Sequence, residues 1–208
     1  MKLSEAVRGV SGTLAADGEF SCIAFATEQE QSQFLTFLEK EKFLPALDNS
    51  KISCVLTTSA LAEKIPPHIK GVFLCDRPKA ALFEIHNRLA RHPDYVGASA
   101  ATVVGEGCSI SPLAAIDCEN VVIGDRVTIE PFVVIKGRVI IGNDVTIRSG
   151  AVIGCKGFSF SKDAQGQNVS VEDTARIIIE DHVEIFEQVA ISTGIFPWEE
   201  TRIGENTK

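Results

Sequence analysis

Histidine is the side chain best suited to acid–base chemistry near neutral pH, and this sequence of 208 residues contains four. Three of them, His68, His86 and His92, lie in the first half of the chain, and His86 is expected at the surface of a helix. His182 is alone in the second half, three residues after Ile179, and is expected to point outward. It is either a general base or, as its outward position favours, a residue of the surface or of a subunit contact. One histidine in this half argues against a catalytic zinc site, which would need three converging ligands.

The other reactive side chains are six cysteines, which show neither CxxC pairs nor the spacing of metal ligands. They are Cys22, Cys54, Cys75, Cys108, Cys118 and Cys155. We interpret them as small buried apolar residues in a reducing compartment, rather than as disulfide partners or metal ligands. No metal site is expected.

The charge of the chain limits its partners. Its formal net charge is −8, which argues against nucleic acid, because a phosphate backbone binds basic surfaces. A small anionic ligand would need lysines and arginines that gather locally. The N-terminus lacks the apolar core of a signal peptide, and no apolar run approaches the roughly 20 residues of a membrane span. We therefore expect a cytoplasmic protein without a transmembrane segment.

Isoleucine recurs every six residues in the second half of the chain, a period that neither a helix nor an open strand explains. The series gains one extra residue before Ile123 and is interrupted by a long insertion after Ile153. These anchor residues are Val104, Ile110, Ile116, Ile123, Ile129, Ile135, Ile141, Ile147, Ile153, Ile179, Ile185, Ile191 and Ile203. A small or β-branched apolar residue follows most anchors by four positions, and glycine, expected to let the chain turn, often follows directly.

This period predicts a triangular parallel β-helix, in which each hexad forms one side, the anchor points inward and three hexads close one coil. Residues one coil apart should then stack. Two opposite-charge pairs are expected in this way: Arg126 with Asp144, and Glu130 with Arg148. Arg138 under Lys156 would be a like-charge pair, which is either splayed and hydrated or part of an anion-binding patch.

The first half of the chain has the mixed pattern of a small α/β domain. Residues 52–58 and 71–76 are suited to short buried strands, and residues 78–91 follow a helical pattern. Residues 27–47 are ambiguous, because their start matches a helix capping box while QFLTFL suits a strand. The expected domains are residues 1–94 and residues 95–208, with an extended loop at 155–178.

Several stretches resemble the UDP-3-O-acylglucosamine N-acyltransferase family of lipid A synthesis. FLTFLEKEKFLPALDNSKISCVLTT is similar to the family's uridine-binding segment, CDRPKAAL to its Asp-x-Pro helix start, and VIGCKGFSFSKDAQGQ to its extended loop. ARIIIEDHVEIFEQVAI and TRIGEN resemble the coils that follow. The resemblance covers essentially the whole chain. It implies a small α/β N-terminal domain followed by a left-handed parallel β-helix of hexapeptide repeats.

The resemblance also implies a function and a site. The family moves a 3-hydroxyacyl-type chain from acyl-carrier protein to the 2-amine of a UDP-3-O-acylglucosamine-like sugar. Phe37 and Phe43 would bracket the uracil beside Lys42, while Arg138 and Lys156 would contact a phosphate or the carrier protein. Aromatic residues of an acyl channel or trimer contact would be Phe158, Phe160, Phe186, Phe196 and Trp198. The protein would be a homotrimer without a bound cofactor, because its acyl donor is carried on the phosphopantetheine of the carrier protein.

Departures from the family pattern leave alternatives open. KEKF at residues 40–43 replaces the usual Asn-Pro-Lys-Tyr, so Phe43 keeps a stacking face but lacks the tyrosine hydroxyl. The family's histidine base would lie about one coil beyond Lys208, so we expect a fragment and assign no catalytic residue. The alternatives are an acetyl-CoA-dependent sugar acetyltransferase and a catalytically inactive protein that binds a nucleotide sugar.

Overall fold

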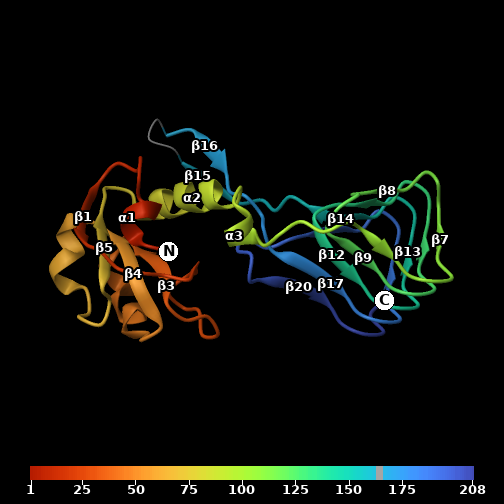
Figure 1. Cartoon of the computed structure of the whole chain (residues 1–208), viewed down its shortest axis with the longest axis horizontal. Helices are drawn as coiled ribbons and strands as arrows, with labels where there is room; N and C mark the ends of the chain where they lie inside the picture. The colour runs from red at the N-terminus through yellow and green to blue at the C-terminus, as the bar shows by residue number, and fades with distance from the viewer. Residues whose placement is uncertain (163–165) are drawn as a thin grey trace. The chain divides into compact units, whose positions relative to one another are not determined.

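The computed structural model describes residues 1–162 and 166–208 (Figure 1). The described chain divides into two compact units. The first unit comprises Met1–Tyr95 and Ser159–Glu172, and the second comprises Val96–Phe158 and Asp173–Lys208. A segment from the middle of the repeat region, Ser159–Glu172, therefore belongs structurally to the N-terminal unit.

A five-stranded sheet forms the centre of the first unit, in the order β1-β5-β4-β3-β2 (Figure 1). Its strands are β1 (Thr13–Ala16), β2 (Cys22–Ile23), β3 (Phe34–Leu38), β4 (Ile52–Thr57) and β5 (Gly71–Leu74). Strands β2 to β5 are parallel to one another, and β1 pairs antiparallel with β5. The strands predicted at residues 52–58 and 71–76 are confirmed as β4 and β5. The ambiguous QFLTFL forms β3, so a helix there is wrong.

Helix α2 (Pro78–Leu89) packs against β3 and β4 and confirms the helix predicted from residue 78. Proline at its first residue suits a helix start, where the missing N–H would have no helical partner. The buried side of α2 includes the expected apolar face: Ala81, Leu82, Ile85 and Leu89. The other described helices are α1 (Leu3–Ala6), α3 (Pro93–Val96) and the 3₁₀ helices η1 (Glu41–Asp48) and η2 (Ser59–Lys64). The segment Ser159–Glu172 contributes the antiparallel strands β15 (Phe160–Lys162) and β16 (Asn168–Ser170).

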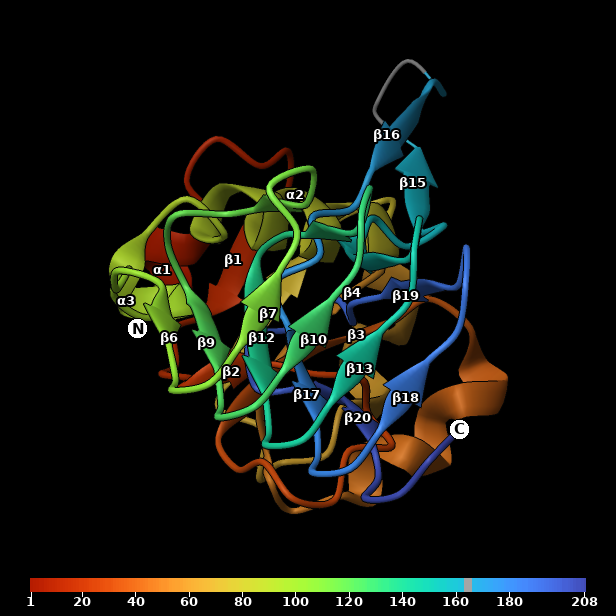
Figure 2. The same cartoon turned by 90° about the vertical axis from the view of Figure 1, so that its right-hand side faces the viewer.

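Three parallel sheets form the sides of the second unit, and Figure 2 shows the strands of the second sheet next to one another. The first sheet contains β6 (Val103–Val104), β9 (Val121–Ile123), β12 (Arg138–Ile141), β17 (Arg176–Ile179) and β20 (Glu200–Ile203). The second contains β7 (Ser109–Ile110), β10 (Thr128–Ile129), β13 (Thr146–Ile147) and β18 (Glu184–Ile185). The third contains β8 (Ala115–Ile116), β11 (Val134–Ile135), β14 (Val152–Cys155) and β19 (Ala190–Ser192).

The strand register confirms the predicted coil. Ile129 lies opposite Ile147, and Ile135 lies opposite Ile153, so residues 18 apart stack in the central coils. The anchors and the small residues four positions later fill the interior together, and Val127, Val133, Val139, Val145 and Ala151 are all fully buried. The second unit is therefore a parallel β-helix of hexapeptide repeats. Its left hand remains a prediction from the family resemblance.

The insertion does not disturb the register of the coils. Ile141 of β12 pairs with Ile179 of β17, although the two are 38 residues apart in sequence. The chain leaves the helix after β14, contributes β15 and β16 to the first unit, and rejoins the first sheet at β17. Stacking across this gap cannot be read from a fixed step of 18 residues.

Glycine follows several anchors because a side chain would not fit there. A Cβ on Gly124 would lie only 2.6 Å from the carbonyl oxygen of Gly142 and 2.8 Å from the side-chain oxygen of Asn143. That oxygen accepts a hydrogen bond from the backbone N–H of Asp125 at 2.9 Å, and Asp181 accepts one from Asn143 at 2.8 Å. Asp and Asn side chains thus link successive coils directly above the glycines. The expectation that these glycines serve to turn the chain is wrong at Gly124, whose φ is not positive.

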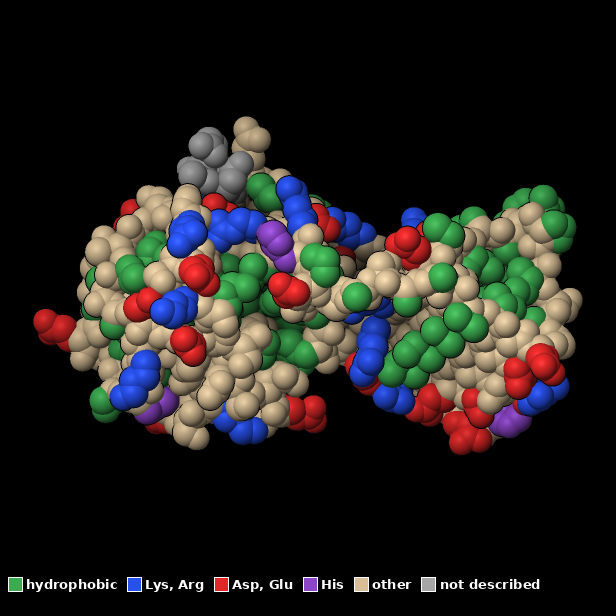
Figure 3. Space-filling model, in the orientation of Figure 1, with side chains coloured by type: hydrophobic (Ala, Val, Ile, Leu, Met, Phe, Trp, Pro, Cys, Tyr) green, Lys and Arg blue, Asp and Glu red, His purple; other side chains and the backbone are tan. Residues whose placement is uncertain are grey.

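The three outer faces of the β-helix differ in chemistry. Side chains alternate inward and outward along each strand, so the residue beside each anchor faces out. On the first sheet these are Val103, Val122, Ile140, Ile178 and, on β20, Arg202, and Figure 3 shows hydrophobic side chains in a diagonal strip over this sheet. On the third sheet they are Ala115, Val134, Val152 and Ala190. On the second sheet they are Ser109, Thr128, Thr146 and Glu184. The third face is aliphatic, the first is aliphatic from β6 to β17 and ends with Arg202 on β20, and the second is polar.

Candidate functional site

Three phenylalanines meet beside the parallel sheet of the first unit, and we call them the aromatic cluster: Phe25, Phe37 and Phe83. Phe25 follows the end of β2, Phe37 lies near the end of β3, and Phe83 belongs to α2. The ring of Phe25 stands edge to face against Phe37 at 6.4 Å between centroids and against Phe83 at 6.5 Å. Ligands of open α/β sheets bind beyond the carboxyl ends of the strands, which is where Phe25 and Phe37 lie.

Lysines accompany these rings. The Lys79 ammonium lies 5.9 Å from the centroid of the Phe83 ring, and the Lys42 ammonium lies 4.7 Å from that of Phe43. Phe43 itself is 55% exposed on η1. Phe83 is buried, so of these two rings only Phe43 presents an exposed face beside an ammonium group. Such a pair suits a planar heterocycle that carries anionic groups, because the ring can stack and the lysine can meet the charge.

The predicted trio Phe37, Lys42 and Phe43 thus lies in one unit, with Lys42 against Phe43. In the described part of the chain, no ring contact joins Phe37 to Phe43; Phe37 contacts Phe25 instead. Whether Phe37 and Phe43 bracket a base stays a prediction. Sequence reasoning missed Phe25 and Phe83. Phe83 could have been predicted, because it lies next to Leu82 on the buried side of the predicted helix and so faces the sheet.

The predicted stack of Arg138 under Lys156 is wrong. Arg138 pairs in register with Arg176 of β17, because the chain leaves the coil before Lys156 could complete the next one. The Arg138 guanidinium donates to the carbonyl oxygen of Gly97 at 2.9 Å. Arg176 donates through Nε to Glu200 at 2.8 Å, which offsets its charge beside Arg138. The roles predicted for Arg138 and Lys156 toward a phosphate or carrier protein stay predictions.

The aromatic residues predicted for an acyl channel or trimer contact differ in exposure. Phe158, in the second unit, is 96% exposed, and Phe186 is also exposed on the β-helix. Phe160 is exposed on β15 in the first unit. Phe196 is fully buried within the second unit and stacks on Trp198 at 5.9 Å. Phe160 belongs to the first unit and the other four belong to the second, so their common role stays a prediction.

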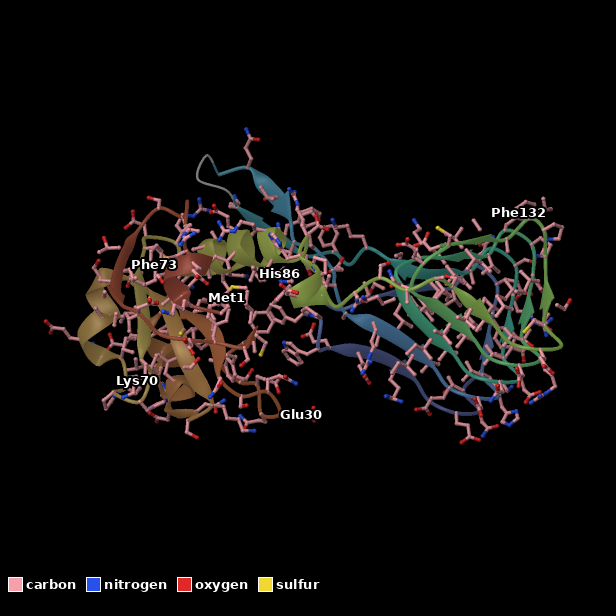
Figure 4. The ribbon with its side chains drawn as sticks, in the orientation of Figure 1. Met1, Glu30, Lys70, Phe73, His86 and Phe132 are labelled. Atoms are coloured by element: carbon pink, nitrogen blue, oxygen red, sulfur yellow. The ribbon has the colours of Figure 1, made fainter. Side chains whose placement is uncertain are left out.

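His86 is fully buried, so its expected surface position is wrong (Figure 4). Its ring is 3.0 Å from the Tyr95 hydroxyl through Nδ1 and 2.8 Å from the Glu172 carbonyl oxygen through Nε2. Since a carbonyl can only accept, Nε2 carries a proton and donates it to the Glu172 carbonyl oxygen. The next residue, Asn87, donates to the Ser170 carbonyl at 2.9 Å and accepts from the Glu172 N–H at 2.8 Å. These two residues of α2 hold the end of the segment Ser159–Glu172.

His182 is exposed, as expected, and takes part in a charged ladder on the β-helix. Its Nδ1 lies 4.0 Å from Oδ2 of Asp144, which also accepts from Arg126 at 2.7 Å. Both expected opposite-charge stacks are confirmed, since Arg148 reaches Glu130 at 2.9 Å. These contacts account for the position of His182 as a surface residue of the ladder.

The thiols nearest the sheet of the first unit are poor nucleophiles. Burial raises the pKa of Cys75 to about 11, and burial together with the nearby Glu28 carboxylate raises that of Cys22 to about 11. Both thiols are therefore protonated near neutral pH. Cys54 and Cys75 are buried as expected, whereas Cys118 is exposed.

The charged ladders make the stability of the β-helix depend on pH. Hydrogen bonds from Arg148, and then from Ser149, hold the pKa of Glu130 below its usual value of 4.5, and Arg126 lowers the pKa of Asp144 in the same way. A carboxylate with a lowered folded-state pKa stabilises the fold above its unfolded-state pKa. That contribution is lost as the pH falls through the folded-state value.

We therefore expect the unfolding temperature to be nearly constant between pH 7 and pH 5 and to fall below about pH 4.5, the unfolded pKa of a glutamate. Replacing Arg148 with methionine should make this fall smaller, because Arg148 lowers the pKa of Glu130. The exposed Lys136→Met serves as control and should leave the acid dependence unchanged. Thermal unfolding across this pH range measures the unfolding temperature of each variant. If that temperature falls equally in Arg148→Met and in the wild type, the ion pair of Arg148 with Glu130 does not cause the acid dependence.

Residues 1–162 and 166–208 were searched for membrane-spanning helices and for clusters of metal ligands. Within them, no helix combines the length and apolar character needed to cross a membrane. Nor do these residues bring three or more His, Cys, Asp or Glu side chains together in a way that could hold a metal ion.

Comparison with known proteins adds a family and named relatives. Residues 120–155 match the family model described as bacterial transferase hexapeptide (six repeats). The UDP-3-O-acylglucosamine N-acyltransferase of Coxiella burnetii (strain RSA 493 / Nine Mile phase I) is 28% identical over 99% of this chain and 66% of its own length. The proteins of the same name from Helicobacter hepaticus and Helicobacter pylori are 31% and 26% identical, over 90% and 100% of this chain and 61% and 67% of their own lengths.

The chain thus spans about two thirds of the length of the curated relatives it matches. Similarity extends over nearly all of its residues, including the first unit, and the hexapeptide match covers the central coils of the β-helix. The resemblance noted from the sequence is confirmed. This chain carries hexapeptide repeats and is similar, over nearly all of its residues, to proteins named UDP-3-O-acylglucosamine N-acyltransferase.

Proposed function

We propose that this protein acts in the transfer of an acyl chain from acyl-carrier protein to the 2-amine of a UDP-3-O-acylglucosamine-like sugar, in the cytoplasm. The names of the relatives support this reaction class, and the aromatic cluster with Lys79 supports a nucleotide ligand in the first unit. The acyl donor is carried on the phosphopantetheine of the carrier protein, with no bound cofactor. Arg138 and Lys156 are proposed contacts of the acidic carrier protein or of a phosphate.

The observation that carries the nucleotide assignment is the grouping of Phe25, Phe37 and Phe83 beside the carboxyl ends of the strands, with Lys79 near the Phe83 ring. A base stacked on an aromatic side chain gains about 1–3 kcal/mol. Uridine diphosphate is the simplest probe, because it carries the heterocycle and the charge but no sugar or acyl chain.

Phe37→Ala is expected to weaken the binding of uridine diphosphate by about 5- to 150-fold, because the base loses a stacking surface. Phe43→Ala should have a similar effect if Phe43 stacks on the other side. Isothermal titration calorimetry on this chain measures both. Phe132→Ala is a matched control, since Phe132 is an exposed phenylalanine of the second unit (66% exposed, Figure 4) and should not change the affinity. Unchanged affinity in Phe37→Ala would remove the stacking assignment.

We also propose that the protein is a homotrimer built through its β-helix. A ring of identical copies uses a different patch on each side of every contact, whereas a two-fold dimer needs only one self-complementary patch. The β-helix presents two different aliphatic faces and one polar face. Packing the first aliphatic face of one copy against the third-sheet face of the next would bury both and leave the polar face in water. The exposed Phe158, Phe160 and Phe186 are proposed to lie near such contacts or an acyl channel.

Ile140→Glu should convert the trimer to monomer, because it places a charge in the middle of the aliphatic face of the first sheet. Thr146→Glu is the matched control, since Thr146 faces outward from the polar second sheet at a similar height. Sedimentation velocity on the full chain separates the two states. A monomeric wild type, or equal dissociation in both variants, would contradict the proposed faces.

A further inference from the structure

The most exposed ring of the aromatic cluster is carried by a loop rather than by a strand or a helix. Phe25 is 37% exposed, whereas Phe37 is half-buried and Phe83 is buried. It belongs to residues 24–31, between β2 and β3, which we call the Phe25 loop. A ring that stacks on a ligand must be held in place beforehand, because a loop that becomes ordered only on binding lowers the affinity. The contacts of the Phe25 loop therefore determine how well this ring is placed.

Two side chains of a short turn hold the middle of the Phe25 loop. The amide of Asn49 donates to the carbonyl oxygen of Glu28 at 2.7 Å and to that of Ala26 at 3.3 Å. The ammonium group of Lys51 donates to the carbonyl oxygen of Gln29. Backbone carbonyls of an irregular segment need such partners, because no neighbouring strand pairs with them. The position of the loop thus depends on this turn.

Asn49 also lies at the end of the helix that carries Phe43. It is half-buried, directly follows η1, and its backbone carbonyl oxygen lies 3.2 Å from Nε2 of His68. Its side-chain oxygen accepts from the backbone N–H of Lys51 at 3.1 Å, so both polar atoms of the side chain are used. A single side chain therefore joins the loop of Phe25 to the helix of Phe43.

A cavity of about 500 Å³ lies between these two segments, within the first unit. Ala26 and Thr27 line it from the Phe25 loop. Pro45 and Ala46 line it from η1, and Asn49 is part of its wall. Because the walls of this cavity come from both segments, the hydrogen bonds of Asn49 across it fix the separation of the loop from the helix.

We propose that Asn49 is a positioning residue of the nucleotide site. It fixes the Phe25 loop against η1 and so holds the rings of Phe25 and Phe43 in the arrangement that receives the ligand. Asn49 acts through the loop and not by contact with the ligand. Without its hydrogen bonds, the loop would have to be ordered at the moment of binding, and that cost would appear as lost affinity. This inference rests on the nucleotide binding proposed for the first unit and adds a residue outside the stacking rings.

Asn49→Ala should weaken the binding of uridine diphosphate about 5- to 30-fold, because it removes both hydrogen bonds from the side chain to the loop. Isothermal titration calorimetry on the full chain measures this change. Asn168→Ala is the matched control, since Asn168 is an exposed asparagine of β16 in the same unit and should leave the affinity unchanged.

The Phe37→Ala variant tells the failure of this inference from the failure of the nucleotide site. If Phe37→Ala binds uridine diphosphate more weakly and Asn49→Ala binds it like the wild type, Asn49 does not position the site. If Phe37→Ala also binds it like the wild type, the nucleotide site itself is wrong, and the role of Asn49 is overturned with it.

Hydrogen exchange separates positioning from a general loss of stability. In Asn49→Ala without ligand, the amides of residues 24–31 should exchange faster than in the wild type, whereas those of β4 should exchange as before. Saturating uridine diphosphate should restore the protection of the loop, because ligand binding and loop ordering are coupled in both directions. Faster exchange in β4 as well, or a loop that the ligand leaves unprotected, would overturn the proposal.

Discussion

Ile147→Ala is expected to lower the free energy of unfolding of the second unit by about 2–5 kcal/mol. Ile147 is fully buried and stands between Ile129 and Ile185 in the column of anchors of the second sheet. Removing its outer carbons leaves a void that stacked coils cannot close, because neighbouring strands are held in register by their backbone hydrogen bonds. The loss comprises both the lost burial and the cavity.

Tryptophan fluorescence offers a local measurement of this effect. Trp198 is the only tryptophan of the chain and lies in the second unit, so its emission during urea unfolding reports on the β-helix. Thr146→Ala is the matched control, since the neighbouring Thr146 faces outward on the polar face, and its effect should stay within about 0.5 kcal/mol. Equal losses in the two variants would mean that Ile147 does not fill a closely packed core.

Replacing His86 with alanine is expected to cost about 2–4 kcal/mol and to release the segment Ser159–Glu172 from the first unit. The change removes the hydrogen bonds of the ring to Tyr95 and Glu172 and leaves a void at a fully buried position. Limited proteolysis should then cut within Ser159–Glu172 much faster than in the wild type.

Two further variants distinguish this role from a general loss of stability. His86→Gln keeps a donor that can reach the Glu172 carbonyl, so it should restore part of the protection. His92→Ala changes an exposed histidine and should digest like the wild type. If His86→Ala unfolds at lower temperature but Ser159–Glu172 stays as resistant as before, His86 stabilises α2 without holding the segment.

The sequence predicts the β-helix well, because each anchor interacts with residues at a constant step along the chain. Ile129, Ile135 and Ile147 lie in the register that the period predicts. The prediction from this constant step fails where the chain leaves the β-helix. Arg138 stacks with Arg176 rather than with Lys156, since an insertion changes the partner without changing the local pattern.

The site is less predictable, because its contacts join distant parts of the chain. His86 follows Leu82 and Ile85 on the buried side of α2, so its burial could have been inferred from the helical spacing. Its partner Glu172 is 86 residues away, and no local pattern indicates that contact. The same holds for Phe25, which meets Phe37 and Phe83 only once the sheet has formed. The need for glycine at position 124 likewise arises only from the next coil, whose Gly142 and Asn143 leave no room for a side chain.

The division of the first unit into two stretches of chain has a consequence for protein synthesis. Met1–Tyr95 leaves the ribosome first, but the contacts of His86 and Asn87 require Ser159–Glu172, which follows only after the 63 residues of Val96–Phe158. At typical translation rates this delay lasts about 3–13 s. During that interval, the nascent N-terminal unit exposes the face of α2 that the hairpin of β15 and β16 later covers. The first coils of the β-helix are made before the unit that precedes them is complete, so the two units finish folding in an interleaved order rather than one after the other.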